Sequence, residues 1–297
     1  MGEPEEQKPV RKVSTQGRPA ELEDWLNGEI YHPLSMRLAR ALAATPVTPN
    51  MVSVAGGLTI VLAAVAYGMG TSLVAVLIGL ALHMSWHVLD GADGDLARIT
   101  GRTSSSGEVI DGICDYAGHI VLYVTLGFML SADVGPAIAW SLAIGAGAAR
   151  IVQAAHYEVQ RRQYQHWAYG TKWLRISHKE GQKPSGIIGF LASYYVNLAK
   201  LLAPGGREID ALVASAADKD EGAVRAIIRK EIKPVLRSTY LLSANYRTIV
   251  LGLSMLAGSP LYFFVFEAIG LTIVLAVSIF TAGAVTRKIQ DQAKSLR

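Results

Sequence analysis

The chain has 297 residues, of which 51% are hydrophobic and only 18% are charged, and its mean hydropathy is +0.29. So little charge on so apolar a chain excludes an ordinary soluble protein and predicts an integral membrane protein. The 28 Lys and Arg exceed the 24 Asp and Glu, which gives a net charge of +4. Attraction to anionic lipid explains this excess, and no motif indicates nucleic-acid binding.

The N-terminal region divides into two parts before the first membrane span. Residues 1–20 are polar and charged without an apolar core, so we expect a disordered cytoplasmic tail rather than a signal peptide or a span. Residues 21–49 form a juxtamembrane region in which a helix starts at Pro33 and alternates apolar with basic positions: Leu34, Arg37, Leu38, Arg40 and Leu42. This spacing predicts an amphipathic helix in the membrane interface, although an ordinary packing helix would show the same pattern.

Six apolar segments follow, each close to the length of about 20 residues that a helix needs to cross the hydrocarbon core. The stretch from Ala41 to Leu89 contains no charged residue and holds two of them. The predicted spans are Met51–Met69, Leu73–Leu89, Ile110–Leu130, Pro136–Ala155, Tyr240–Leu256 and Leu261–Val285. The predicted fold is therefore all-α and polytopic, with six transmembrane helices within residues 50–285 and an N-terminal interfacial amphipathic helix.

The distribution of Lys and Arg predicts the orientation of these spans. The loops near Gly70, Asp133 and Gly258 contain neither residue, whereas every other connection is basic. Because basic loops stay on the cytoplasmic side, we expect both termini there, including a tail at residues 286–297. The loop Ile99–Gly107 belongs to the same side. The expected location is a bacterial inner membrane.

Residues 158–237 are predicted to form a cytoplasmic insertion. Within it, Ile187–Ala203 is apolar enough to span, but Asn197 and Lys200 interrupt it, and spanning would place a basic stretch outside. We therefore expect this segment to lie in the interface. The part from Asp218 to Arg237 predicts a helix that ends near Pro234.

Four carboxylates lie at the inner ends of the second and third spans. Asp90 and Asp93 form one pair, and Asp111 and Asp115 form the other. Residues three or four apart share a helix face, and two antiparallel helices with a short loop bring such pairs together. Four adjacent carboxylates would repel, so divalent cations are expected between them, and oxygen-only ligands suit Mg²⁺ or Mn²⁺. Two such ions suit phosphoryl or phosphodiester chemistry.

Residues between the two pairs fit a phosphate-containing ligand. Gly94, Gly107 and Gly112 lack side chains where a ligand or a facing helix could approach, and Arg98 offers a forked donor. Asp95, beside the pairs, is interpreted as a solvated loop acid. The alternative that the acids only cap helices and solvate a loop explains one pair, but two pairs at helical spacing favour a functional site.

Other polar residues within the spans could recognise an acceptor. Arg150 and Arg247 lie where an unpaired charge is costly, and together they could bind an acceptor with its own phosphate, such as inositol phosphate or glycerol phosphate. The alternatives are snorkelling for Arg150 and a structural pairing for Arg247. His83 and His87 are expected to be packed or hydrogen-bonded rather than metal ligands. Glu267 lies near the outer part of the sixth span, where it could reach water, and has no assigned role.

The acidic region as a whole resembles the signature of a known family. The pattern D-x2-D-G-x2-A-R-x8-G-x3-D-x3-D is similar to that of the CDP-alcohol phosphotransferases and is complete in this chain. It is filled by Asp90, Asp93, Gly94, Ala97, Arg98, Gly107, Asp111 and Asp115. The sequence Thr48-Pro49-Asn50 also resembles the family's entry to its first helix. The insertion at residues 158–237 is longer than expected from simpler members.

The resemblance implies a role for each matching residue. Asp90, Asp93, Asp111 and Asp115 would ligate two Mg²⁺ or Mn²⁺ ions, with Asp115 also the general base. The nucleotide pocket would be lined by Asn50, Gly94, Ala97, Arg98 and Gly107. An acceptor hydroxyl would attack the β-phosphorus of a CDP-linked lipid and release CMP. A soluble donor such as CDP-inositol, with a lipid or inositol acceptor, is the alternative. The family's usual homodimer is expected as well.

Two other functional classes are compatible with acids in a membrane protein. Aspartate-rich membrane prenyltransferases also use magnesium, but they place their pairs in separate repeats without the intervening G-x2-A-R pattern. A non-enzymatic cation carrier needs acids along a translocation path, and the outer half of the predicted bundle has almost none. The pattern therefore favours the phosphotransferase.

Overall fold

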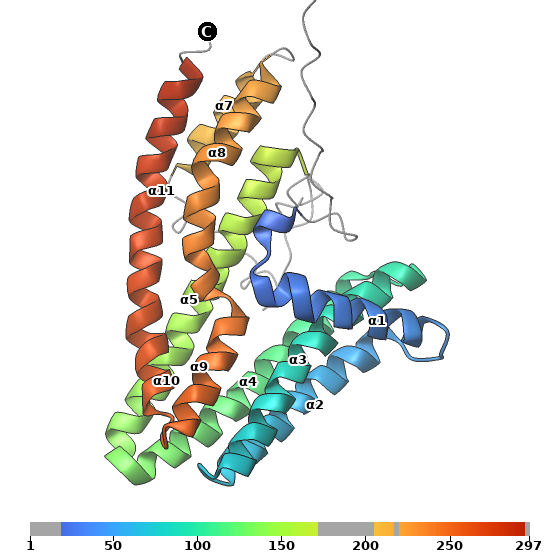
Figure 1. Ribbon diagram of the computed structural model, residues 1–297, viewed down its shortest axis with the longest axis vertical. Coiled ribbons are helices and arrows are strands. Elements are labelled where there is room, and N and C mark those ends of the chain that lie inside the picture. The colour runs from blue at the N-terminus through green and yellow to red at the C-terminus, as the bar shows by residue number, and fades with distance from the viewer. Residues whose placement is uncertain (1–18, 172–204, 217–219, 295–297) are drawn as a thin grey trace, which may run out of the picture.

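The computed structural model describes residues 19–171, 205–216 and 220–294, and within these ranges every regular element is a helix (Figure 1). The predicted all-α class is therefore confirmed. The elements are η1 (Ala20–Leu22), η2 (Asn27–Tyr31), α1 (His32–Ala43), α2 (Pro49–Gly68), α3 (Leu73–Thr100), α4 (Ser105–Val134), α5 (Pro136–Tyr169), α7 (Gly206–Ser215), α8 (Glu221–Thr239), η3 (Tyr240–Leu242), α9 (Ala244–Leu256), α10 (Leu261–Val265), η4 (Phe266–Gly270) and α11 (Leu271–Lys294).

Five helical stretches among the described residues are long and apolar enough to cross a membrane. They are Pro49–Gly68, Leu73–Thr100, Ser106–Val134, Pro136–Tyr169 and Leu261–Lys294. They confirm a polytopic membrane protein. The sixth predicted span, Tyr240–Leu256, is the 13-residue helix α9, which is about 20 Å long at 1.5 Å per residue. It is shorter than predicted because the chain is extended at Ser243, which interrupts the helix between η3 and α9.

The turn between α3 and α4 is short, and each side of it is capped. Gly101 ends α3 in the left-handed conformation, with φ of 67°, which glycine adopts without steric cost. The Ser104 side chain accepts a hydrogen bond from the Gly107 backbone N–H at 3.0 Å and so begins α4. Two antiparallel helices joined in this way place the end of α3 beside the start of α4, as the sequence predicts.

Glycines let α2 pack closely against α4. A Cβ atom on Gly57 would lie 3.0 Å from the Cys114 carbonyl oxygen, and one on Gly118 would lie 3.0 Å from the Gly57 carbonyl oxygen. Side chains at these positions would force the helices apart, because real Cβ contacts are rarely so short. Cys114 itself is a free thiol in this contact.

The far parts of α5 and α11 join α7 and α8 in a second helical layer (Figure 1). Its apolar core includes Tyr164, Trp167, Ile228 and Ile289. Arg225 on α8 donates to the Trp167 carbonyl oxygen at 2.7 Å and so satisfies the C-terminal end of α5. The predicted insertion boundaries stay a prediction, and the predicted interfacial segment Ile187–Ala203 lies outside the described residues, as does the tail at residues 1–18.

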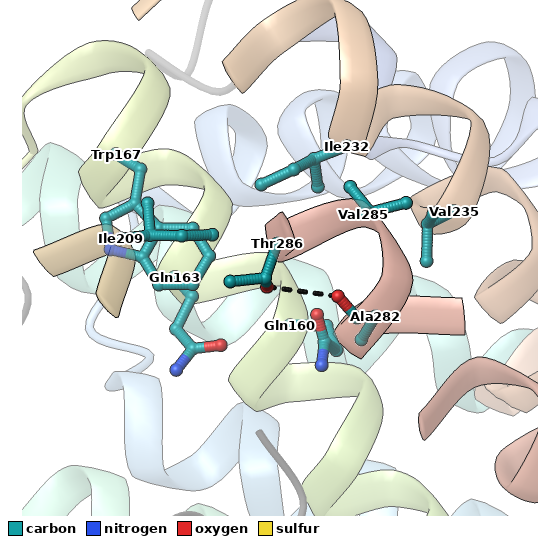
Figure 2. A pocket seen from close by; sticks show the side chains of 9 residues that line it. All are labelled: Gln160, Gln163, Trp167, Ile209, Ile232, Val235, Ala282, Val285 and Thr286. Atoms are coloured by element: carbon teal, nitrogen blue, oxygen red, sulfur yellow. Dashed lines mark hydrogen bonds between the residues drawn. The ribbon is translucent and has the colours of Figure 1, made fainter. Parts of the chain in front are cut away.

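A small cavity lies inside this second layer, between α5, α7, α8 and α11 (Figure 2). Gln160, Gln163, Trp167 and Thr286 are among the side chains that line it, together with aliphatic residues. Its volume of about 20 Å³ has room for roughly one water molecule. It is too small to bind a nucleotide.

Several predicted helix ends are wrong. The helix predicted to end near Pro234 continues to Thr239, because Leu236 and Thr239 are buried against the second layer and hold the last turn in place. The helix predicted at Pro136–Ala155 continues to Tyr169, and α11 continues beyond Val285 to Lys294. The predicted helices end where polar residues begin, but in the structure these polar residues are also helical.

Helix α1 crosses α3 near its acidic end (Figure 1). The Ser35 hydroxyl donates to the Val88 carbonyl oxygen at 2.9 Å, and Gly91 leaves the space that Ser35 occupies. Ala39 on α1 and Leu96 on α3 belong to one small buried cluster. The predicted helix after Pro33 is confirmed, while its place in the membrane interface stays a prediction.

Candidate active site

Acidic side chains from α3 and α4 converge beside the short turn between these helices. Carboxylate oxygens of Asp90, Asp111 and Asp115 all lie within 4.8 Å of one another, a geometry that could hold a metal ion. The fourth acid, Asp93, lies one turn beyond Asp90 on α3. The Ser53 hydroxyl of α2 donates to Asp93 at 2.5 Å. The structure therefore brings all four predicted acids together at one site.

The donor set fits a hard divalent cation. Carboxylates this close repel each other strongly in a partly dehydrated site, and a cation between them relieves the repulsion. The three clustered groups offer oxygen atoms alone, which are the ligands that Mg²⁺ and Mn²⁺ prefer. His83 and His87 both contact the Thr248 hydroxyl instead, at 3.3 and 2.9 Å, which confirms that they are hydrogen-bonded.

The arginine of the acidic region lies along the same helix as the first acidic pair. The Arg98 guanidinium pairs with Asp95 at 2.5 Å and passes over Gly94, where a Cβ atom would lie 3.4 Å from it. The Arg98 side chain is 51% exposed and so remains open to a ligand. The interpretation of Asp95 as a solvated loop acid is wrong: Asp95 is on α3 and 1% exposed, since the helix continues ten residues beyond Asp90 to Thr100.

Two further predicted nucleotide residues meet across α2 and α4. A Cβ atom on Gly107 would lie 3.4 Å from the Asn50 side-chain oxygen, so the amide group of Asn50 lies directly against this glycine. Ala97 lies one turn beyond Gly94 on α3. Gly112 faces open space, with no atom within 4 Å of a built Cβ. The predicted nucleotide residues therefore lie on α2, α3 and α4, the same helices that carry the acids and Ser53.

Comparison with known proteins supports this site. A family model described as CDP-alcohol phosphatidyltransferase matches residues 46–210, more than half of the chain. The chain belongs to this family. No curated protein matches the chain. Membership makes the protein a transferase of phosphate-containing groups, with a CDP-alcohol donor and a hydroxyl acceptor in a membrane lipid environment. The matched region includes all four acids and Arg98, whereas Arg247 and Glu267 lie beyond it.

A buried ionic network of the transferase centres on Glu267. This residue is 0% exposed and so does not reach water, although its place near the outer part of the predicted span would allow it: it is buried in the π-helical turn η4. Arg247 donates to Glu267, and Gln153 accepts from Arg247 at 3.0 Å. Arg150 approaches Glu267 at 3.7 Å. Pairing of this kind keeps charges stable where water is scarce.

The two predicted acceptor residues differ in their surroundings. Arg247 is 2% exposed, and its guanidinium donates to Glu267, to Gln153 and to the Leu242 carbonyl oxygen. The Arg150 side chain is 20% exposed, and its guanidinium lies 3.7 Å from Glu267 and 5.9 Å from the centre of the Tyr123 ring. Arg150 is therefore the more exposed arginine of the network.

Sequence reasoning missed several partners of the acids. Ser53 and Trp86 donate to Asp93 and Asp115, and Tyr123 donates to Glu267. They come from other helices or from distant turns, 29 to 144 positions away in the chain. The sequence holds no local signal for these contacts, because each depends on how the helices pack.

Proposed function

We propose that the transferase moves a phosphoalcohol group from a CDP-linked donor to a hydroxyl acceptor and releases CMP. The acceptor oxygen attacks the β-phosphorus and forms a new P–O bond. The bond from the β-phosphorus to the oxygen that bridges the two phosphates breaks, and CMP leaves with that oxygen. The proton of the acceptor hydroxyl passes to a carboxylate. The convergence of Asp90, Asp111 and Asp115 within 4.8 Å is the observation that carries this proposal.

In the proposal, Asp90, Asp93 and Asp111 hold divalent cations, and Asp115 contributes to the same cluster. Bound Mg²⁺ or Mn²⁺, as two ions, supplies positive charge that stabilises the phosphate oxygens and the leaving group. Asp115 accepts the hydroxyl proton, since a carboxylate beside the reacting group can serve as a general base. Ser53 restrains Asp93 through its 2.5 Å hydrogen bond.

The cytidine diphosphate of the donor is assigned to the surface formed by Asn50, Gly94, Ala97, Arg98 and Gly107. The exposed guanidinium of Arg98 is the donor for the diphosphate, because a planar fork matches phosphate oxygens. The glycines allow the ligand to approach the helix backbones closely.

For the acceptor we favour a compound with its own phosphate, such as inositol phosphate or glycerol phosphate. Arg150 is proposed to bind that phosphate, because it is partly exposed and lies on α5, which packs against the acidic helix α4. Arg247 is proposed to support Arg150 through their shared partner Glu267. The donor in this proposal is CDP-diacylglycerol, and a soluble CDP-alcohol with a lipid acceptor is the alternative.

The site is proposed to face the cytoplasm, from the basic loops on its side of the bundle, in a bacterial inner membrane. A homodimer is part of the proposal. Family membership argues against a prenyltransferase and against a cation carrier. The acids also cluster at one end of two helices rather than along a path through the membrane, which a carrier would need.

CMP release tests the proposal. The purified protein in detergent is incubated with Mg²⁺ and CDP-diacylglycerol, and with inositol phosphate, glycerol phosphate, inositol or serine as acceptor. CMP with one phosphorylated acceptor supports both the reaction and the acceptor class. CMP with inositol or serine alone would refute the role of Arg150. If none of the four acceptors gives CMP release, but CDP-inositol with a lipid acceptor does, the result would favour the soluble donor.

A further inference from the structure

Trp86 connects the two acidic helices at the proposed base. It lies on α3 one turn before Asp90, and its indole Nε1–H donates to Asp115 Oδ1 on α4 at 2.7 Å. The Trp86 side chain is 5% exposed. A buried indole N–H has little access to water, so the carboxylate is its hydrogen-bond partner in place of solvent.

The indole ring is held from several directions. Its centroid lies 4.5 Å from the ring centroid of His87 and 4.7 Å from that of His119. On α2, a Cβ atom on Gly56 would lie 3.5 Å from the Trp86 ring, so this glycine leaves the space that the ring fills. His119 Nδ1 also contacts the Asp115 backbone oxygen at 2.8 Å. The indole therefore has little freedom to turn away from Asp115.

We propose that Trp86 is a positioning residue for Asp115. This inference rests on the proposed function, in which Asp115 receives the hydroxyl proton. The indole N–H occupies one carboxylate oxygen of Asp115 and so fixes which oxygen faces the cations and the acceptor. A carboxylate that can rotate spends less time in the reactive orientation, and partners that orient such groups typically contribute about 10- to 100-fold to activity or metal affinity.

The chain contains a matched control for this hydrogen bond. Trp167 in the second helical layer donates from its indole nitrogen to Asp210 Oδ1, also at 2.7 Å, and is 4% exposed. Trp86→Phe and Trp167→Phe therefore remove the same chemical group from equally buried rings. A loss of stability alone would affect both variants, whereas a loss of positioning would affect Trp86→Phe alone.

The experiment measures kcat, the donor KM and Tm for both variants with the acceptor that supports CMP release. Trp86→Phe is expected to lower kcat by roughly 10- to 100-fold with a donor KM within about threefold of wild type. Trp167→Phe is expected to retain kcat. Trp86→Gln, whose amide can still donate, should exceed Trp86→Phe in kcat. The proposal is overturned if Trp86→Phe retains kcat or if both Phe variants lose kcat equally. Should Trp86→Phe fail to fold, Trp86→Gln is measured alone, and a fall in its kcat of more than about 100-fold would overturn the proposal.

Tryptophan fluorescence gives a readout that is independent of turnover. Mn²⁺ bound at the acids should quench Trp86, because its indole donates to Asp115 of the acidic cluster. The quench should therefore be larger in wild type and Trp167→Phe than in Trp86→Phe. If the wild-type protein shows this quench but releases no CMP, the proposed function is refuted, whereas the position of Trp86 beside the acids is supported. CMP release together with an equal quench in all three proteins would refute the position of Trp86.

Discussion

Asp115, the proposed general base, is contacted by residues of both acidic helices, α3 and α4. Trp86 donates to its carboxylate, His119 contacts its backbone oxygen, and Asp90 and Asp111 complete the cluster. Asp115→Asn keeps the size of the side chain and an oxygen for Trp86, but the amide does not accept the hydroxyl proton. We predict a fall in kcat of roughly 100- to 10,000-fold.

Binding of a CDP ligand in the presence of Mn²⁺ should persist in Asp115→Asn, because the nucleotide residues and the other three acids are intact. Equilibrium binding and single-turnover CMP release measure the two properties separately. If Asp115→Asn turns over at close to the wild-type rate, Asp115 is not the general base.

Arg150 distinguishes acceptors in this account. Its partly exposed guanidinium is proposed to contact the acceptor phosphate, and loss of a charged hydrogen bond typically costs about 1.5–3 kcal/mol. Arg150→Gln should therefore raise the KM for inositol phosphate roughly tenfold or more and change the donor KM little. Steady-state kinetics with each substrate varied in turn measures this. Equal changes in both KM values would indicate that Arg150 only supports Glu267.

At this scale the sequence predicts the acids better than their partners. The spacing of Asp90, Asp93, Asp111 and Asp115 defines two faces of two helices, which is local information. The burial of Glu267 was missed because a span viewed alone does not reveal that Glu267 lies in a π-helical turn and pairs with Arg247, 20 residues earlier in the chain. Trp86 carries no polar signal of its own, since an indole in an apolar helix looks like a core residue.

Among the elements, α2 and α4 depend most on close backbone approach. Gly118→Leu would place a side chain against the Gly57 carbonyl and Ile60, where a Cβ atom alone would lie 3.0 Å from each. Overpacking of this kind costs about 1–3 kcal/mol or more. We predict a lower Tm in detergent for Gly118→Leu.

Gly283→Leu is the control for that change, because no atom lies within 4 Å of a Cβ built on this helical glycine. Its Tm should stay close to that of wild type. Equal Tm values for the two variants would contradict the role of Gly118 in helix packing.

The segment before α1 is attached to the second helical layer through Glu21. Burial raises the pKa of this carboxyl, but hydrogen bonds from Tyr164, Tyr169 and Lys233 outweigh it, so the pKa of Glu21 is lowered from 4.5. Because the pKa of Glu21 is lower in the folded state, ionised Glu21 stabilises the fold at pH values above its unfolded-state pKa of 4.5. This stabilisation is lost as the pH falls through the pKa of the folded state.

Glu21→Gln should therefore lower Tm at pH 7, and its difference from wild type should shrink below about pH 4.5. Glu29→Gln, an exposed change in the same segment, is the control and should leave Tm unchanged. Thermal unfolding in detergent across this pH range measures both. A difference that grows on acidification would contradict the assigned contacts of Glu21.

Helix types were predictable from the sequence, but several helix ends were not. Apolar length identifies α2 to α5 and α11, because the membrane imposes a minimum length on each span. The ends of α5, α8 and α11 depend instead on burial of residues such as Trp167, Leu236 and Ile289 in the second layer. Contacts between distant segments hold these turns helical, and Pro234 alone does not end α8.

At the scale of the whole molecule, an apolar bundle carries a concentrated acidic site beside the turn between α3 and α4. The family match and the five candidate spans agree that this is a membrane-embedded transferase. The proposed chemistry needs cations, because the clustered carboxylates would otherwise repel each other and the negatively charged donor. Metal dependence is thus the central claim that connects the geometry to the reaction.

The most direct test measures CMP release from CDP-diacylglycerol by the purified protein, first in EDTA and then during a titration with Mg²⁺ or Mn²⁺, with Asp111→Asn as a second sample. The account predicts no CMP in EDTA, recovery as either ion is added, and a weaker response to the ion in Asp111→Asn. CMP release that is unchanged in EDTA would contradict it.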